Sequence, residues 1–410
     1  MNKNRLEDGA LPIISLLVSV VFVLASGVVF QLKTSVEQNN PATSQETLGV
    51  ITKNEFRSPV ELNLPIAPDQ IKSVYLTGGS GGRQKYVDYI IELARTTQIN
   101  AVVVDIKDYS GYVLYKTSDL IAPLVGEYKA KKIAITDIES MIKKFHDAGI
   151  YVIARIVVFQ DSVLAKARPD LAVLKKYEPL DNIALSFPAF WTDRAGLMWV
   201  DPASKEVWDY NIAIAKDALT RGFDEVNFDY IRFPSDGDLK NISYPFWDSK
   251  TTKHSAIKGF FKKLREELPN EKLSVDLFGL ATINRDDLGV GQIIEDAFLY
   301  FDYVCPMVYP SHYAKGFLKY DNPADYPYEV VNYSMARAME RLRVFRLNNP
   351  DIQRNVYLRP WLQDFNLKAD YDANMVKLEI KATLDALGTN DFKGFMLWNA
   401  SNIYTEGAVK

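Results

Sequence analysis

Cysteine and histidine, two residue types that often bind metals, are scarce in this sequence. Its 410 residues include one cysteine, Cys305, which excludes an intramolecular disulfide and any site built from several cysteine ligands. A metal-dependent polysaccharide deacetylase would need an aspartate and two histidines close together, but His146, His254 and His312 fall in separate segments. We therefore disfavour that class of enzyme and predict neither a metal nor a cofactor. Cys305 lies in an apolar run and is predicted to be a small core residue.

The sequence also lacks a strong charge imbalance and a complete phosphate-binding motif. Its formal net charge is -4, so neither a nucleic acid nor an anionic membrane surface is predicted as a partner. A glycine-rich run occupies residues 78–82, but the Lys-Ser or Lys-Thr ending of a phosphate loop does not follow it. We interpret this run as a turn that leads into a helix.

The composition is that of a globular protein rich in aromatic rings. Hydrophobic residues make up 48% of the chain and charged residues 24%, which is typical of a protein with a substantial core. Aromatic residues make up 12%. This proportion fits a carbohydrate cleft lined with stacking rings and fits a large core equally well.

The N-terminal segment predicts a membrane anchor. Lys3 and Arg5 precede an uncharged run over residues 9–32, which is long enough to cross a bilayer core of about 30 Å as a helix. The flanking positive charges favour a cytoplasmic N-terminus. Cleavage after the small residues 25–27 would release the protein, but the apolar run continues past them, so we favour an uncleaved anchor. The predicted organisation is a cytoplasmic tip and anchor (1–33), a flexible linker (34–67) and one domain (68–410).

Strand-like and helix-like segments alternate through the predicted domain. We expect strands at residues 73–77, 101–106, 151–158, 225–229, 273–278, 302–309, 355–361 and 393–398. Helical spacing and end signals place helices at residues 84–97, 135–148, 204–221, 252–268, 291–300, 328–346 and 372–387. Eight strands separated by helices predict an α/β fold, a closed parallel (β/α)8 TIM barrel. The alternative, a doubly wound open sheet, would need a switch point that the sequence does not show.

The fourth predicted strand is the part of the chain around which the candidate site is organised. In residues 225–234, reading EVNFDYIRFP, alternation places Asn227 and Asp229 on one face and Val226 and Phe228 on the other. An amide and a carboxylate that face inward at the C-terminal end of a barrel strand lie at the position of TIM-barrel active sites. Asp229 could instead cap the following turn.

Two carboxylates on neighbouring strands suggest glycosidic-bond cleavage. That reaction uses one carboxylate to attack or stabilise an oxocarbenium-like centre and one acid to protonate the leaving oxygen. Asp229 and Asp276, at the ends of strands four and five, are the predicted pair. Arg155 or Arg232 would keep Asp229 ionised, since a nearby positive charge lowers the pKa of a carboxyl. A purely structural ion pair remains an alternative for Asp276.

Further polar and aromatic side chains at the strand ends are predicted to bind substrate. They are Asp105, Lys107, Arg155, Asn227, Arg232, Tyr309, His312, Trp361, Asp364 and Trp398. Two of them have structural alternatives, because Asp105 could pair with Lys107 or Arg155 and Trp398 could plug the barrel mouth.

Three of these segments carry a resemblance to a known family. Residues 224–234 (DEVNFDYIRFP), 304–313 (VCPMVYPSHY) and 359–365 (RPWLQDF) resemble a family of glycoside-hydrolase-like barrels long described as a domain of unknown function. The resemblance extends over about residues 73–399. The family is similar at a distance to α-amylase-like glycosidases, in which the aspartate of strand four is the nucleophile. That role falls on Asp229 here.

The resemblance implies a glycoside hydrolase that acts on a cell-envelope or extracellular polysaccharide. Several relatives have their acid/base after strand five or six, where this sequence offers Asp276, Tyr309 and His312. Asp276 is therefore the expected acid/base. The rival interpretation is a membrane-anchored barrel that binds carbohydrate without cleaving it.

The predicted anchor can be tested on intact cells. If residues 9–32 hold the chain in the membrane with the domain outside, added protease should release a fragment that begins within residues 34–67. Immunoblotting of the medium would detect it. Complete protection of the domain would contradict the predicted orientation.

Overall fold

Stretches of β-branched residues form the buried strands. The computed structural model describes residues 67–118, 133–176 and 189–410. In β2 (Ala101–Lys107, AVVVDIK) and β3 (Tyr151–Val157, YVIARIV) every residue is buried, as expected of parallel strands covered on both faces. Pairing between the strands is parallel throughout the main sheet.

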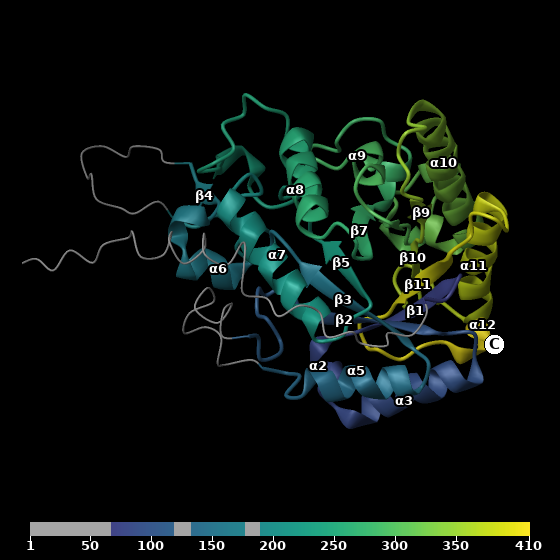
Figure 1. Ribbon diagram of the computed structural model, residues 1–410. Helices are drawn as coiled ribbons and strands as arrows, with labels where there is room; N and C mark the ends of the chain where they lie inside the picture. The colour runs from purple at the N-terminus through teal and green to yellow at the C-terminus, as the bar shows by residue number, and fades with distance from the viewer. Residues whose placement is uncertain (1–66, 119–132, 177–188) are drawn as a thin grey trace, which may run out of the picture. The chain divides into compact units, whose positions relative to one another are not determined.

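The main sheet closes into a barrel (Figure 1). Its remaining strands are β1 (Ile71–Leu76), β5 (Glu225–Asp229), β7 (Leu273–Phe278), β8 (Tyr303–Met307), β9 (Tyr357–Leu358), β10 (Trp361–Gln363) and β11 (Gly394–Trp398). The order is β10-β11-β1-β2-β3-β5-β7-β8-β9, and β10 also pairs with β8, which closes the ring. This confirms the predicted (β/α)8 barrel. β4 (Leu174–Lys175) and β6 (Ile242–Ser243) form a separate antiparallel pair.

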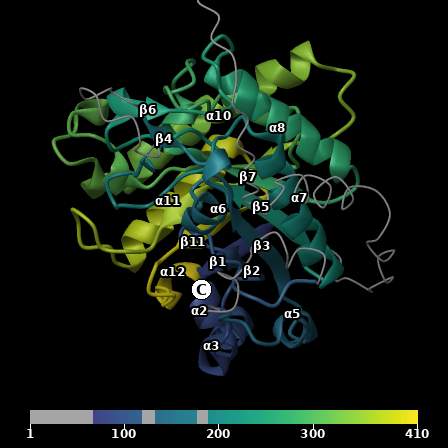
Figure 2. The ribbon, with the colours of Figure 1, turned by 90° about the vertical axis from the view of Figure 1, so that its left-hand side faces the viewer.

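Helices surround the strands and connect them (Figures 1 and 2). The longer ones are α3 (Gln84–Thr96), α5 (Ile138–Asp147), α7 (Lys205–Thr220), α8 (Lys253–Glu267), α10 (Pro327–Asn348) and α11 (Ala373–Leu387). The shorter α-helices are α2 (Gly78–Gly81), α6 (Ser162–Ala167), α9 (Ile294–Phe298) and α12 (Glu406–Val409). Single 3-10 turns are η2 (Pro169–Leu171), η3 (Leu239–Asn241), η4 (Gly279–Thr282), η5 (Pro310–His312), η6 (Phe317–Lys319) and η7 (Pro323–Asp325).

Local sequence signals explain several helix starts. Ser204 caps α7 by accepting a hydrogen bond from the Val207 backbone N–H. The glycine-rich run forms α2, capped by Thr77. A Cβ on Gly82 would lie 1.8 Å from the Ala134 carbonyl oxygen, so glycine is needed there for close packing.

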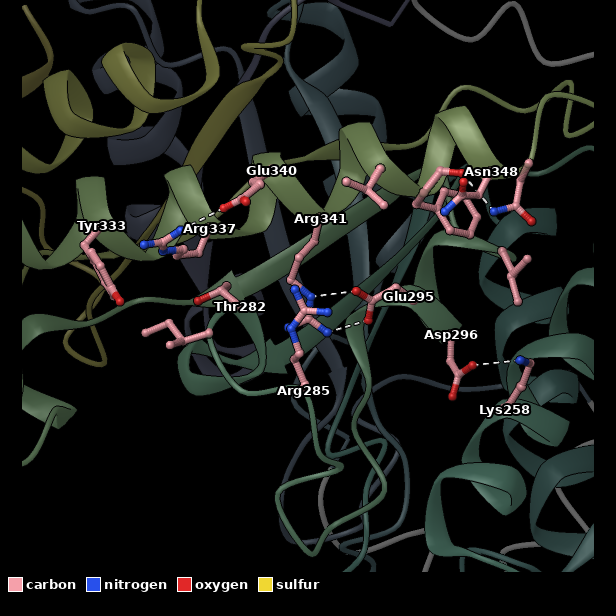
Figure 3. A pocket seen from close by; sticks show the side chains of 15 residues that line it. Lys258, Thr282, Arg285, Glu295, Asp296, Tyr333, Arg337, Glu340, Arg341 and Asn348 are labelled. Atoms are coloured by element: carbon pink, nitrogen blue, oxygen red, sulfur yellow. Dashed lines mark hydrogen bonds and ion pairs between the residues drawn. The ribbon is translucent and has the colours of Figure 1, made fainter.

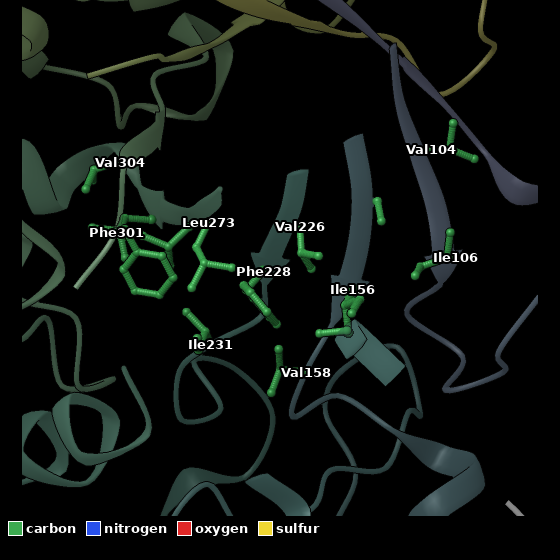
Figure 4. Packing of buried hydrophobic residues seen from close by; sticks show 14 of the residues in the cluster. Val104, Ile106, Ile156, Val158, Val226, Phe228, Ile231, Leu273, Phe301 and Val304 are labelled. Carbon is green, nitrogen blue, oxygen red and sulfur yellow. The ribbon is translucent and has the colours of Figure 1, made fainter. Parts of the chain in front are cut away.

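Side-chain alternation divides the packing into two shells. Outward residues of the strands, including Val226 and Phe228, pack among the apolar residues beneath the helices (Figure 4). Inward residues, including Val103, Ile153 and Cys305, fill the barrel interior. Cys305 is fully buried, which confirms its predicted place in the core.

A buried ion pair lies inside the barrel at the start of β5. Arg359 Nη1 donates to Glu225 Oε2 at 3.2 Å, and Nη2 contacts Glu225 Oε1. Both side chains are fully buried, and Ser274 Oγ donates to Glu225 Oε1 at 2.5 Å. The Arg359 guanidinium also lies 4.2 Å from the centre of the Tyr303 ring. These contacts join β5, β7, β8 and the segment between β9 and β10.

Two strands depart from the expected regular pattern. The seventh strand, predicted as one segment, is divided into β9 and β10 at Arg359 and Pro360, because proline has no N–H for the ladder. In β2 the register shifts between Asp105 and Lys107, so that Asp105 pairs with Arg155 and Lys107 with Ile156. This irregularity turns Lys107 away from the inward face that simple alternation predicted.

The predicted membrane anchor (1–33) and residues 34–66 of the predicted linker lie outside the described residues. Within residues 67–118, 133–176 and 189–410, no helix combines the length and apolar character needed to cross a membrane.

The ion pair inside the barrel predicts a double-mutant result. Arg359→Met alone should lower the free energy of unfolding by about 3–5 kcal/mol, because it leaves Glu225 as a buried unpaired charge. Adding Glu225→Leu should restore most of the loss. Urea denaturation of the single and double variants measures both values. A loss below about 1 kcal/mol in the single variant would contradict this account.

Candidate active site

The C-terminal ends of the strands surround a cavity of about 470 Å³ at the barrel mouth. Eight of the residues predicted from the sequence line it: Arg155, Asp229, Asp276, Arg232, Tyr309, His312, Trp361 and Trp398. The other lining residues are Tyr230, Phe278, Gly279, Leu280, Met307 and Tyr313. Acidic, basic and aromatic groups from several strands therefore meet in one hollow, as in a TIM-barrel active site.

Arg155, on β3, links three carboxylates. Its Nη1 donates to Asp105 Oδ1 at 2.5 Å, its Nη2 donates to Asp229 Oδ2, and its Nε lies 3.7 Å from Asp276 Oδ2. Burial alone would lower the pKa of Arg155, but the carboxylates of Asp105 and Asp229 hold it well above its usual range. The guanidinium is therefore a fixed positive charge in the floor of the cavity.

Asp229 is the last residue of β5, and a tight turn orients its carboxylate. The next residue, Tyr230, has φ +51°, a left-handed conformation uncommon for a residue with a Cβ. This turn lets the Tyr230 N–H donate back to Asp229 Oδ1 at 2.6 Å. Arg155 contacts the other carboxylate oxygen, and 8% of the side chain is exposed, toward the cavity. Asp229 thus has the ion pair that the sequence predicted and still borders open space.

Asp276, on the neighbouring strand β7, lies in a different environment. Its Oδ1 accepts hydrogen bonds from Asn227 Nδ2 at 2.9 Å and Trp361 Nε1 at 2.8 Å, whereas its Oδ2 has no hydrogen-bond partner. Burial, followed by repulsion from Asp229, raises the pKa of Asp276 well above its usual range, although Arg155 opposes the shift. Asp276 therefore holds a proton to higher pH than an ordinary aspartate does.

Aromatic rings form the walls of the cavity. Trp398 stacks on Tyr75 with ring centres 3.9 Å apart, and Trp361 meets Trp398 edge-on at 5.7 Å. The Arg155 guanidinium lies 5.3 Å from the Trp398 ring centre. Trp398 is thus both a wall of the cavity and part of the packing that holds Arg155 in place.

Elsewhere in the cavity wall Arg232 is buried, whereas His312 at the rim is more exposed. The Arg232 guanidinium lies 4.6 Å from the ring centre of Phe278 and 4.9 Å from that of Trp199. Burial lowers the pKa of Arg232. Tyr309 is buried, and this burial raises its phenol pKa well above the usual range. Burial also lowers the pKa of the His312 imidazole, with a smaller contribution from Lys368.

Two predicted site residues lie beneath the cavity rather than in its wall. Asp105 accepts hydrogen bonds from Arg155 and the Tyr75 hydroxyl, so it supports the cation from below. This agrees with the alternative of an Asp105–Arg155 ion pair. Asn227 bridges Ser274 and Asp276 and is fully buried. Asp105 acts on the carboxylate pair through Arg155, whereas Asn227 donates directly to Asp276, and neither residue lines the cavity.

Two other predicted substrate contacts, Lys107 and Asp364, do not line the cavity. The fully buried Lys107 pairs with Asp161 at 2.9 Å and donates to the Val157 carbonyl oxygen, because the shift in β2 turns it toward β3 and α7. Asp364 accepts hydrogen bonds from the Thr405 N–H and hydroxyl, at 2.9 and 2.6 Å. It therefore holds the C-terminal segment and does not line the cavity.

The sequence interpretation missed several residues of the site. Tyr75 was detectable, because alternation along β1 places it inward near the strand end, where its hydroxyl donates to Asp105. Leu280, Met307 and Tyr313 were harder to find, since they are ordinary apolar or aromatic residues on loops or strand ends. Tyr230 was hidden because its importance comes from its backbone conformation.

The three histidines, already distant in sequence, also make different contacts. His146 pairs with Asp224 at 2.9 Å and His254 with Asp296 at 3.0 Å, whereas His312 lies at the cavity rim. In the part of the chain that the structure describes, no group of three or more His, Cys, Asp or Glu side chains could hold a metal ion.

Comparison with known proteins identifies the family of this sequence. Residues 73–404 match a family described as "putative glycosyl hydrolase domain". The chain belongs to this family. The match begins within β1 and includes all later strands of the barrel, with Asp229 and Asp276 among the matched residues. No protein of curated function matches the sequence.

Solved structures with similar folds include one close in sequence. A hypothetical protein from Ruminiclostridium thermocellum ATCC 27405 is 37% identical, over 53% of this chain and 98% of that one, with a TM-score of 0.42. A chitobiase from Flavobacterium johnsoniae is 13% identical, over 83% and 47% of the two chains, with a TM-score of 0.49. An α-galactosidase from Thermus thermophilus is 13% identical, over 84% and 61%, with a TM-score of 0.45.

The geometry predicts that the titration of Asp276 depends on Asp229. Asp229→Asn removes a negative charge that raises the pKa of Asp276, so that pKa should fall. Carbon-13 NMR of labelled aspartate carboxyl groups across a pH series measures the change. The exposed Asp147→Asn serves as a control and should leave the Asp276 titration unchanged. An Asp276 pKa that stays the same or rises in Asp229→Asn would contradict the described coupling.

Proposed function

We propose that the barrel hydrolyses glycosidic bonds in a polysaccharide, with Asp229 as nucleophile or charge stabiliser and Asp276 as general acid. The observation that carries this proposal is the contrast between the two carboxyl groups. They lie on adjacent strands and line the same cavity, yet Asp229 is paired with Arg155 while Asp276 has a strongly raised pKa. Glycosidases need one ionised and one protonated carboxyl on either side of the scissile bond.

The hydrogen bonds of Asp276 favour one site for its proton. Oδ1 already accepts two hydrogen bonds, so the proton is expected on Oδ2. From there it would pass to the leaving glycosidic oxygen. Asp276 would then be an anion near Arg155, whose Nε lies 3.7 Å from Oδ2. The guanidinium can thus stabilise the charge that appears on Asp276 as the bond breaks.

Asp229 would act on the sugar that remains after the leaving group departs. As the leaving group departs, positive charge develops at the anomeric carbon of the remaining sugar. The Tyr230 N–H and Arg155 hold both Asp229 oxygens, which fixes the direction of the carboxylate. The partly exposed Trp398 offers a ring surface on which the sugar can pack, and His312 lies at the rim where a longer chain would leave the cavity.

The proposed substrate is a cell-envelope or extracellular polysaccharide. This part of the proposal rests on the sequence: residues 1–33 would anchor the chain in the membrane, residues 34–67 would link, and the barrel domain (68–410) would lie outside the cytoplasm. A polymeric substrate also suits a cavity that is open at one end and lined by rings.

The proposed roles predict distinct kinetic defects. Asp276→Asn should lower kcat by about 10²–10⁴-fold, since it removes the general acid. Asp229→Asn should lower kcat by more than about 10³-fold while preserving glycan binding. In the parent enzyme, kcat/KM should fall as pH rises through the raised Asp276 pKa, because the acid loses its proton. Reducing-end assays on starch, galactomannan, xylan and glycol chitin provide the measurements.

A substitution on the protein surface is the control for these kinetic measurements. Asp147→Asn, exposed on α5, should behave as the parent. Binding of a glycan without hydrolysis by the parent protein would instead support the rival function, a carbohydrate-binding barrel.

A further inference from the structure

A second hollow lies on the outer flank of the barrel, beside α10. It has a volume of about 470 Å³ and lies between α10 and the loop that joins β8 to α10. We name it the side groove. Its principal lining residues are Tyr320, Tyr328, Asn332, Tyr333, Arg337 and Glu340.

The side groove combines flat rings with polar groups. Tyr320 stacks on Tyr326 with ring centres 3.7 Å apart and an angle of 11°, and Tyr326 is 40% exposed. The Arg337 guanidinium lies 5.3 Å from the Tyr333 ring centre and pairs with Glu340 at 2.8 Å. Rings present apolar faces that can pack on the C–H face of a sugar, while the charged side chains can bind hydroxyl groups.

A line of aromatic contacts joins the side groove to the catalytic cavity. Tyr313 lines the cavity, and its ring centre lies 4.4 Å from that of Phe317. Phe317 in turn lies 6.0 Å from Tyr333, which lines the side groove. The Tyr313 hydroxyl also lies 2.8 Å from Ser334 Oγ, which fastens the loop to α10. One loop therefore contributes residues to the cavity and to the groove.

The hollow surface continues along α10 beyond the side groove. An adjoining cavity of about 540 Å³ shares Tyr333, Arg337 and Glu340 with it (Figure 3). Deeper in that cavity Arg341 is bound to Glu295 and to the carbonyl oxygens of Ala281 and Asn284. Arg341 is thus engaged in structure, whereas Arg337 and Glu340 have more than half of their side-chain surface exposed.

We propose that the side groove binds an uncharged stretch of the same polysaccharide chain whose scissile bond lies in the catalytic cavity. The proposal rests on the glycosidase function proposed above. The ring centres of Tyr313, Phe317 and Tyr333 follow one another at 4.4 and 6.0 Å, so the two hollows lie on either side of one short loop. The groove has two carboxylates, Glu329 and Glu340, for the one guanidinium of Arg337, so it disfavours a polyanionic chain. A second contact on the same chain strengthens its binding through effective concentration.

The test uses affinity electrophoresis of the full chain in gels that contain starch, galactomannan, xylan or glycol chitin. The background variant is Asp229→Asn, so that no polymer is cleaved. Arg337→Ala/Glu340→Ala changes two exposed groove residues, and Tyr320→Ala removes a ring. Arg343→Ala is the matched control, because Arg343 is exposed on the same helix and lines neither hollow.

Binding of at least one polymer should weaken by about tenfold in both groove variants and remain unchanged in the control. Hydrolysis of p-nitrophenyl glycosides by the groove variants, made with Asp229 intact, should equal that of the parent, because so short a substrate reaches only the catalytic cavity. Thermal melting of each variant checks that it folds. If Tyr320→Ala does not fold, the Arg337→Ala/Glu340→Ala variant still provides the test.

Each outcome decides the proposal. If the groove variants bind every polymer as tightly as the background protein, or if no polymer retards the background protein, the side groove is not a glycan site. Cleavage by the parent enzyme decides the glycosidase function separately. Groove-dependent binding without cleavage would retain the glycan site and reject the hydrolase.

Discussion

The buried guanidinium of Arg155 is the group on which the rest of the site depends. It contacts Asp105 and Asp229, approaches Asp276, and packs against the Trp398 ring. Without it, three carboxyl groups would lie together in a poorly solvated space, and repulsion would force protons onto more than one of them. With it, Asp229 has a hydrogen-bonded cationic partner, whereas Asp276 lies 3.7 Å from Arg155 Nε without a hydrogen bond to it. One side chain therefore gives the two aspartates different electrostatic surroundings.

The barrel supplies the rigidity that this arrangement needs. Parallel pairing of β3, β5 and β7 fixes the relative heights of Arg155, Asp229 and Asp276. Deeper in the barrel, the Glu225–Arg359 pair and Ser274 connect the same region of the sheet to β8 and β10. Around the mouth, stacked rings restrict the directions in which the charged groups can move. The barrel interior combines this polar network with a small apolar cluster, and the larger apolar cluster lies outside, beneath the helices.

The regular parts of this architecture were predictable, and the irregular parts were not. Alternation in residues 225–229 correctly put Asn227 and Asp229 inward, and the Gly149, Gly222 and Gly388 stop signals helped to locate helix ends. Alternation failed for Lys107, where a shift of register in β2 turns the side chain outward, and for the seventh strand, which Pro360 divides. The position of Asp364 depends on its contact with Thr405, 41 residues away, which no local pattern encodes. The catalytic roles of Asp229 and Asp276 remain predictions supported by their contrasting surroundings.

Neutron diffraction from crystals of the protein at neutral pH would test this account most directly, because it locates the protons themselves. The account predicts a deuteron on Asp276 Oδ2, none on either oxygen of Asp229, and a fully protonated Arg155 between them. A deuteron on Asp229, or an Asp276 with no deuteron on either oxygen, would contradict the claim that Arg155 divides the two carboxyl groups into an anion and an acid.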